Sequence, residues 1–528
     1  MWCWMQANRR LARIASAIGA FAFSLVGTTA LAQVPLASQA PLSAIDWLND
    51  PVDTPIINPT RPVEPPTSGG ASVPTVDVTP LGAPTADAVG LLSSQATGLP
   101  ADLWRHSDAA TLADLMLAQR LQALPSMQAL FYTLLLTEAE APPTKAGAPS
   151  LLTARLDALM HLGAVEAVQA MLDASGATSP ALFKRWFNAT LMTGDEDRAC
   201  RQLQTTPYLS PSQAARVFCT ARTGDWRTAA LTLETSNALG LIDPQERALL
   251  NLFLDPELFE GDPLPHPPVR PTPLVFRLRE AVGEALPTAP LPRAFAVSDL
   301  RGTAGWKARI EAAERLAQTG ALSPNRLLGI YSERLPAASG GLWDRVDAVQ
   351  RFDIALRARD PSAVANTLPR AVQAMQLARL EVPFAKIYAE DLISLPLSGA
   401  VAETAYHTAL LSPDYEAAAL KMGDVLPQSA FLTALAKGQP GSAPAQTALE
   451  RYVAEGFATL ALPAQFQADM ADRRLGEVIL RAMLLYQRAV AGEVKELPVA
   501  LATFRALGLE DTARRAALHI LILERGTL

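Results

Sequence analysis

Two cysteines, Cys200 and Cys219, have the residue type and spacing that most favour a covalent bond in this chain. Redox-active pairs usually follow the Cys-x-x-Cys spacing, which these two do not have. In an oxidising compartment they favour a structural disulfide. Closing a loop of this size stabilises a fold by roughly 3 kcal/mol on the chain-entropy estimate, and the alternative is two buried free thiols.

The other residues that could carry chemistry do not form a recognisable site. No metal-binding His-Glu-x-x-His motif, nucleophile elbow, phosphate loop or dinucleotide fingerprint occurs. Glu138 and Glu140 precede a Pro-Pro pair and are best interpreted as solvated charges. The histidines are scattered, and we interpret each as structural: His106, His161, His266, His407 and His519. We therefore expect no catalytic, metal or cofactor-binding residues and no cofactor.

The N-terminus has the pattern of a secretory signal peptide over residues 1–32. Three arginines precede an apolar run over residues 14–31, which ends in the small-x-small pattern that signal peptidase cuts, predicting cleavage between Ala32 and Gln33. A retained membrane anchor is the alternative, but the run is short and contains glycine and serine. We expect a periplasmic or secreted protein.

Charge and hydropathy exclude two classes of partner for the processed chain. Removing residues 1–32 and their three arginines takes the formal charge from −7 to −10. An acidic chain without clustered lysine and arginine offers no surface that tracks phosphates, so we expect no binding to nucleic acid or anionic lipid. The apolar run over 516–523 is too short to cross a bilayer, so we expect no integral membrane span after signal removal.

Residues 33–98 form a proline-dense segment that predicts a disordered tail. One short motif, residues 44–48, interrupts it, and in that motif Ile45, Trp47 and Leu48 would share one face of a helical turn. The motif predicts partner binding by docking into a groove on another protein. Packing back onto the chain's own folded part is the alternative.

The remainder of the chain has the periodicity of successive helices. Apolar residues recur at spacings of three and four, and alternating strand-like runs are absent. We divide it into helical repeats over 99–254, a proline-rich connector over 255–292 and a C-terminal helical region over 293–528. The connector contains one amphipathic stretch, 274–285, which favours an ordered connector. In the last region we expect helices over 306–318, 342–358, 362–380, 401–411, 414–424, 443–455, 475–490 and 511–523.

A repeated pattern of glycine, small residue and leucine positions these helices. Each glycine is followed five residues later by a small residue and nine residues later by a leucine, with a period of 31 and then 30 residues. The three sets are Gly163, Val168 and Leu172; Gly194, Ala199 and Leu203; and Gly224, Ala229 and Leu233. Such periods indicate stacked helical hairpins. We predict an all-α, superhelical α-solenoid of antiparallel helical hairpins after the disordered N-terminal segment.

The repeat resembles the tetratricopeptide family, in which the second helix of a hairpin carries this pattern and a proline seventeen residues after the glycine. Pro180 and Pro211 stand at that position for the first two glycines, whereas Leu241 replaces it for the third. The resemblance implies binding of proteins or peptides on a concave surface, without cofactor or catalysis. Because the first helix of each hairpin lines the inner face in such folds, the resemblance makes a set of residues candidates for this surface: Phe183, Arg185, Trp186 and Asn188. The alternative is that Trp186 and Phe187 are core residues, and we prefer it for Phe187.

These observations predict a non-catalytic periplasmic scaffold or adaptor that binds envelope proteins or peptides through a helical-repeat surface. A flexible tail with a docking motif beside a scaffold suits bivalent attachment. The alternative is a cell-wall (peptidoglycan) enzyme, or a regulator of such an enzyme, with a solenoid domain. The C-terminal region lacks the Glu-Ser signature of the lytic transglycosylases that carry such a domain.

Overall fold

A computed structural model describes residues 86–143, 150–259, 261 and 264–523. These residues belong to one compact unit, and the following description concerns that unit alone. The signal peptide over 1–32, its cleavage site at Ala32 and Gln33, and the tail motif with Ile45, Trp47 and Leu48 lie outside the described residues. Those predictions remain predictions.

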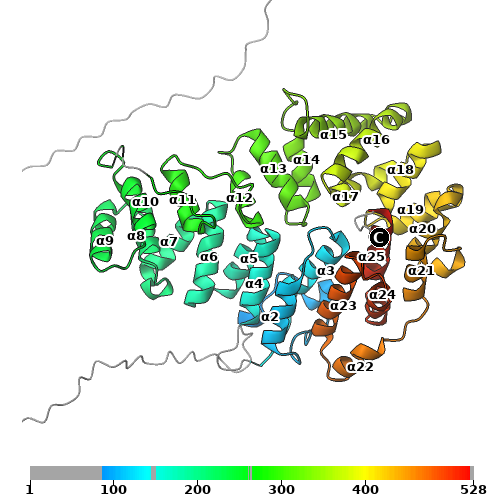
Figure 1. The fold of residues 1–528 in the computed structure, drawn as a ribbon, viewed down its shortest axis with the longest axis horizontal. Coiled ribbons are helices and arrows are strands. Elements are labelled where there is room, and N and C mark those ends of the chain that lie inside the picture. Colours follow the sequence, from blue (N-terminus) through cyan, green and yellow to red (C-terminus); the bar gives the residue numbers. More distant parts are fainter. Residues whose placement is uncertain (1–85, 144–149, 260, 262–263, 524–528) are drawn as a thin grey trace, which may run out of the picture. The chain divides into compact units, whose positions relative to one another are not determined.

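The described part of the chain is an all-α solenoid of antiparallel helical hairpins (Figure 1). It contains no strand, and its only β-type pairing is an isolated bridge between Leu92 and Thr137. The first group comprises η2 (Ala86–Ala88), α1 (Ser94–Thr97), α2 (Ala109–Ala118), α3 (Pro125–Leu136), α4 (Leu151–Leu162), α5 (Val165–Ser175), α6 (Pro180–Thr193), α7 (Glu196–Thr205), η3 (Pro207–Leu209), α8 (Gln213–Arg222), α9 (Trp226–Ala238) and α10 (Pro244–Leu254).

The second group begins in the proline-rich connector and continues to the C-terminal helix. It comprises α11 (Pro273–Ala281), η4 (Arg293–Phe295), α12 (Ala296–Asp299), α13 (Trp306–Ala317), α14 (Pro324–Tyr331), α15 (Leu342–Arg357), α16 (Pro361–Leu377), α17 (Glu381–Leu392), α18 (Gly399–Leu410), α19 (Tyr415–Met422), η5 (Gly423–Val425), η6 (Pro427–Ser429), α20 (Ala430–Ala436), η7 (Pro440–Ser442), α21 (Ala448–Gly456), α22 (Ala464–Ala471), α23 (Leu475–Val490), α24 (Glu496–Ala506) and α25 (Glu510–Ile522).

Left-handed glycines make the turns between consecutive helices of the repeats. Gly163, Gly194 and Gly224 have φ values of 88°, 87° and 96°, a conformation that side chains with a Cβ rarely adopt. Asp225 then caps α9, because its carboxylate accepts the amide of Thr228 at 3.0 Å. A left-handed Gly224 followed by the capping residue Asp225 explains why α8 ends and α9 begins without a long loop.

The small residues and leucines of the repeat form the core between hairpins. Ala199 and Ala229 are fully buried, and a small side chain at that position lets two helices approach closely. Leu172, Leu203 and Leu233 are also buried and fill the space between neighbouring helices. The same core also encloses Val168.

Cys200 on α7 and Cys219 on α8 form a disulfide in the structure, with a Cα–Cα distance of 4.8 Å. The two helices pack against each other as antiparallel neighbours, and both sulfur-bearing residues are buried between them. The disulfide therefore joins two consecutive repeats through their shared core.

Helix starts use different caps, and one segment differs from the sequence-based expectation. The hydroxyl of Ser212 caps α8. Asp195 precedes α7 but caps no amide, and its carboxylate accepts a bond from Gln169 at 2.9 Å. Within the segment expected to be a disordered tail, residues 86–98 are ordered, because backbone bonds join Leu91 and Leu92 to the end of α3. The backbone of this short stretch thus completes its hydrogen bonding against a helix end.

The proline-rich connector is an ordered part of the same compact unit. Its helix α11 packs on α6 and α10, and Arg277 on α11 contacts the fully buried Glu196 at 3.0 Å. An unpaired buried carboxylate would be costly, so this ion pair holds the connector against the repeats. The connector thus does not separate two independent lobes.

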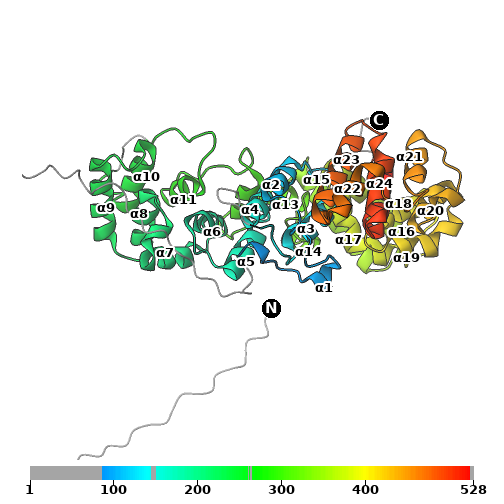
Figure 2. The same cartoon turned by 90° about the horizontal axis from the view of Figure 1, so that it is seen from below.

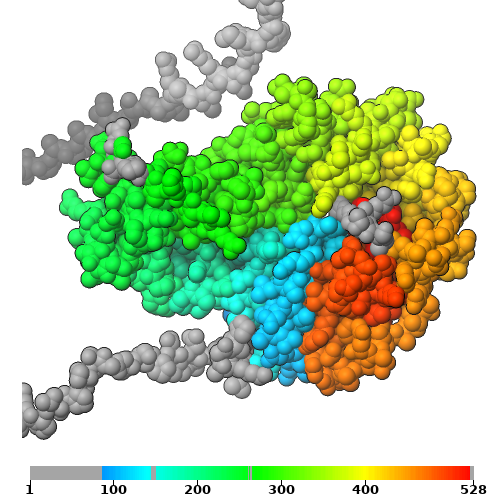
Figure 3. All heavy atoms as spheres, in the orientation of Figure 1, coloured from blue at the N-terminus to red at the C-terminus, as the bar shows by residue number. Residues whose placement is uncertain are grey.

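Helices near the start of the compact unit lie against helices near its end, as the blue atoms beside the orange and red ones show in Figure 3, whereas α8, α9 and α10 lie at the end of the unit away from this contact (Figures 1 and 2). Helix α2 packs on α23, and α3 packs on α25. Gln119 donates to the carbonyl of Leu480 at 3.1 Å, and Arg473 lies 2.5 Å from Asp102. The helices that begin the unit therefore cover apolar faces of the helices that end it.

Replacement of Leu203 by aspartate should unfold the helical repeats, because it puts an unpaired charge into the hairpin core. We expect Leu203→Asp to lower the free energy of unfolding by about 4 kcal/mol or more, measured by urea denaturation. Leu231→Asp on α9 is the matched control, since Leu231 is 68% exposed, and should change it by less than about 0.5 kcal/mol. Cooperative urea unfolding with the same free energy in both variants would contradict the repeat alignment.

Loss of the disulfide should weaken the fold without abolishing it. The double variant Cys200→Ala and Cys219→Ala should lower the free energy of unfolding by roughly 3 kcal/mol in urea denaturation. Peptide mapping of the unreduced protein should recover the two cysteines in one linked pair. Alkylation of both thiols in the unfolded, unreduced chain would show instead that they are free.

Candidate functional site

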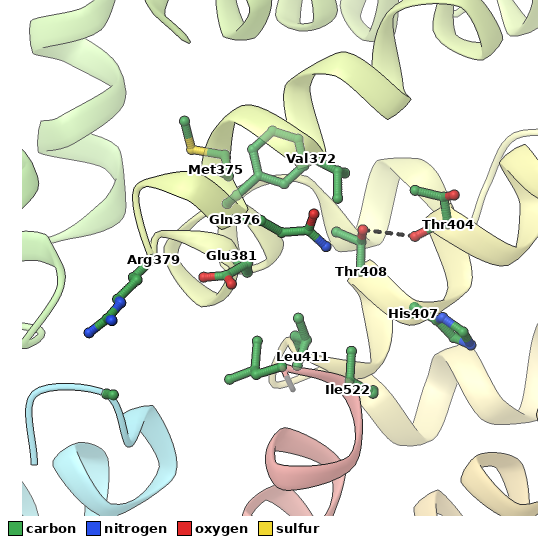
Figure 4. Close-up of a pocket in the computed structure, with 13 residues that line it drawn as sticks. Val372, Met375, Gln376, Arg379, Glu381, Thr404, His407, Thr408, Leu411 and Ile522 are labelled. Carbon is green, nitrogen blue, oxygen red and sulfur yellow. Dashed lines mark hydrogen bonds between the residues drawn. The ribbon is translucent and has the colours of Figure 1, made fainter. Parts of the chain in front are cut away.

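A cavity with a volume of about 650 Å³ lies among the C-terminal hairpins (Figure 4). Helices α16, α17 and α18 form its walls, and the end of α25 lines another side. Ala123, two residues before the start of α3, completes the lining from the other end of the unit. The cavity thus depends on the contact between the first and last helices.

The turn from α16 to α17 places the guanidinium group of Arg379 at this cavity. Asp360 caps the start of α16, with its carboxylate accepting the amides of Ser362 and Ala363. After the last turn of α16, Arg379 has a φ of 55°, which is uncommon for a residue with a side chain. This left-handed residue reverses the chain direction into α17 and leaves its guanidinium exposed at the rim.

Apolar side chains from three helices form the deeper part of the cavity. Met375, Phe384 and Leu411 are each at most 5% exposed. The Phe384 ring lies 5.2 Å from the Phe352 ring and 4.8 Å from the Tyr388 ring, centroid to centroid. This aromatic group fixes the position of Phe384, so the apolar surface is preformed.

The polar groups of the cavity differ in how freely they can contact a ligand. The hydroxyl groups of Thr404 and Thr408 donate to carbonyls of their own helix, at 2.9 and 2.8 Å. Gln376 and Arg379 are exposed, whereas Glu381 is buried. Ligand contacts at the rim would therefore come chiefly from Gln376 and Arg379.

His407 lines the cavity as a neutral ring at pH 7. Burial lowers the pKa of His407, while Glu403 acts in the opposite direction. Its Nε2 atom lies 3.0 Å from the hydroxyl oxygen of Ser429. The described residues include no group of three or more histidine, cysteine or acidic side chains placed to hold a metal ion. The arrangement suits a ligand with an apolar part and an anionic part.

The residues expected to line an inner repeat surface lie mostly in the core. Phe183 and Trp186 are 1% and 5% exposed, so the expectation that they offer a binding surface is wrong. Arg185 and Asn188 are only partly exposed, and Arg185 pairs with Asp157 at 2.6 Å. The aromatic side chains of α6 fill the space against the neighbouring hairpins because they are the largest apolar groups there.

No sequence motif marks the cavity residues. His407 is one of the scattered histidines, and the residues around Arg379 carry no recognised motif. The available signal was the break after α16, where Ala378, Arg379 and Leu380 end one helix without glycine or proline.

Comparison of the chain with protein-family models, curated proteins and solved structures finds no match. Among the described residues, no helix combines the length and apolar character needed to cross a membrane.

The lowered pKa of His407 predicts a pH-dependent contribution to stability. Because the unfolded chain binds a proton at this residue more readily than the folded chain, the contribution is present above the ordinary histidine pKa and is lost as pH falls below it. The urea midpoint of the native protein should fall more between pH 7.5 and pH 5.5 than that of His407→Gln. The exposed His266→Gln serves as control and should match the native protein, and an equal fall in all three proteins would contradict the prediction.

Proposed function

We propose that this chain is an exported, non-catalytic scaffold that binds a peptide segment of an envelope protein in the cavity formed by α16, α17, α18 and α25. The observation that carries the proposal is the combination of a preformed apolar surface with exposed Gln376 and Arg379 at its rim. Ligand sites in proteins are concave and combine apolar side chains with a small number of polar groups that orient the ligand.

The volume and chemistry of the cavity define the kind of segment it would accept. A volume of about 650 Å³ lies within the range typical of ligand sites and accommodates one or two large side chains. Met375, Phe384 and Leu411 would contact an aromatic or aliphatic side chain. Arg379 would pair with a neighbouring carboxylate of the partner.

The architecture supports a scaffold role. Stacked hairpins expose a long surface while sharing one continuous core, which is the usual basis of protein binding by helical repeats. The glycine, alanine and leucine spacing over 163–233 supports a tetratricopeptide-like assignment of the repeats. These features favour attachment of partners over chemistry.

Export is the second element of the proposal. The predicted signal peptide over 1–32 supports it, and so does the disulfide between Cys200 and Cys219, because such bonds persist in oxidising compartments. The tail motif with Trp47 would give the scaffold a second attachment point to the envelope.

The proposal is tested by site-specific photocrosslinking in cells. A photoreactive residue at Gln376, which lines the cavity, should capture a discrete envelope protein that the same residue at Gln373 does not capture. Both positions are exposed on α16, so the pair differs in cavity access. Equal products at both positions, or clearing of cell-wall substrate by the purified chain in a zymogram, would contradict the proposal.

A second, matched pair of variants tests the role of Arg379. Arg379→Gly removes the guanidinium at a left-handed position that glycine adopts without strain, and it should weaken binding of the captured protein about tenfold. Arg359→Gly, at a φ of 54° and outside the cavity, should leave the affinity unchanged. Calorimetric titration measures both, and the same affinity in both variants would exclude Arg379 from the site.

A further inference from the structure

Helix α9 lies at one end of the compact unit, away from the contact between its first and last helices (Figures 1 and 2). It packs on α8 and α10 through the buried side that carries Ala229, Leu233 and Ser236. After α10 the chain turns back through α11 to α6, so among the described residues no further hairpin is stacked on the outer side of α9. The last repeat of a stack remains in solvent when its outer face is polar, so the composition of this side shows whether it is suited to remain open.

The outer side of α9 and the turn that follows it expose large apolar side chains. Leu231, Leu239 and Leu241 are 68%, 66% and 55% exposed. Trp226, at the start of the helix, is 48% exposed. Single apolar residues scattered over a surface are normal, but their concentration on one terminal helix is typical of a surface that another molecule covers. The terminal repeat thus lacks the polar outer face of a capping repeat.

Opposite charges accompany the apolar groups on this side of α9. One stripe along the helix has spacings of four, three and four residues, which place its members on the same face: Arg227, Leu231, Glu234 and Ala238. All four are exposed. The ion pairs of the neighbouring helices join Arg198 and Arg222 to acidic residues, and neither Arg227 nor Glu234 takes part in them. Both charges are therefore available to a molecule that covers the stripe.

Two copies of this stripe are complementary when they run antiparallel. Leu231 lies near the midpoint between Arg227 and Glu234 along the helix. A twofold axis beside Leu231 therefore sets Arg227 of each copy opposite Glu234 of the other, with one ion pair on each side of the axis. Such self-complementarity is what an interface between identical subunits requires. A parallel arrangement in register would instead oppose like charges, which is unfavourable.

We propose that α9 forms the interface of a homodimer, in which the outer stripes of two copies of this chain pack antiparallel. Leu231 contacts its counterpart at the axis, and Leu239 at the end of each α9 lies towards Trp226 at the start of the other. The interface belongs to the repeats and is separate from the cavity of α16, α17 and α18. It does not depend on the function proposed for that cavity, and the dimer carries two such cavities.

Sedimentation equilibrium of the full mature chain tests the proposal. Because one pair of helices is a small interface, the native chain should dimerise with a dissociation constant on the order of 10 µM. Leu231→Asp should remain monomeric to at least about ten times that concentration, because it places two carboxylates at the axis. Leu420→Asp is the matched control, since Leu420 is 65% exposed on α19, and it should dimerise as the native chain does. In solutions dilute enough to be monomeric, both variants should unfold in urea as the native chain does, which separates loss of the dimer from loss of the fold.

Reversal of the charges tests the antiparallel register. Arg227→Glu and Glu234→Arg should each raise the dissociation constant at least about tenfold, because each places like charges opposite one another. The double variant should dimerise like the native chain, and a mixture of the two single variants should form a heterodimer, because the opposite charges face each other again in both cases. A merely local role of these charges in α9 would give no such recovery on mixing. A native chain that is monomeric throughout, a dimer that survives Leu231→Asp, or the absence of recovery in the mixture would overturn the proposal.

Discussion

A helical hairpin cannot bury its apolar side by itself, and this constraint determines how the described part of the chain is arranged. Each hairpin covers the next, from α4 to α10, and α11 and α12 then return to pack on α6. The later hairpins continue until α23 and α25 meet α2 and α3. Closure removes two apolar ends that an open stack would leave to solvent, and it also creates the cavity among α16, α17 and α18, since Ala123 and Ile522 line it together.

Ion pairs, in addition to apolar packing, hold the proline-rich connector against the repeats. Glu196 is fully buried on α7, and Arg277 from the connector and Arg222 from α8 both approach it, at 3.0 and 3.6 Å. Removing Arg277 would leave the buried Glu196 with only the longer contact to Arg222, so the ion pair with Arg277 helps to fix the connector at one place. The connector is therefore held in one place although its composition is rich in proline.

The turns between consecutive helices were predictable from the sequence, whereas the packing between helices far apart in the sequence was not. Gly163 and Gly224 end helices through their own backbone freedom, so spacing alone located these turns. Leu475–Val490 matches its expected range because its apolar periodicity is strong. In contrast, Arg379 adopts a left-handed conformation without glycine, and Phe183 faces the core because of neighbouring hairpins. Such features depend on residues far away in sequence, which no local pattern encodes.

Contact between α3 and α25 has a consequence for biosynthesis. During synthesis or export the N-terminal end of a chain emerges first, so α3 emerges several hundred residues before its neighbour α25. A chain that is cut short before residue 510 would leave this apolar surface of α3 open to proteases and chaperones. The docking of α25 therefore decides whether this surface of α3 is buried or is open to recognition as unfolded protein.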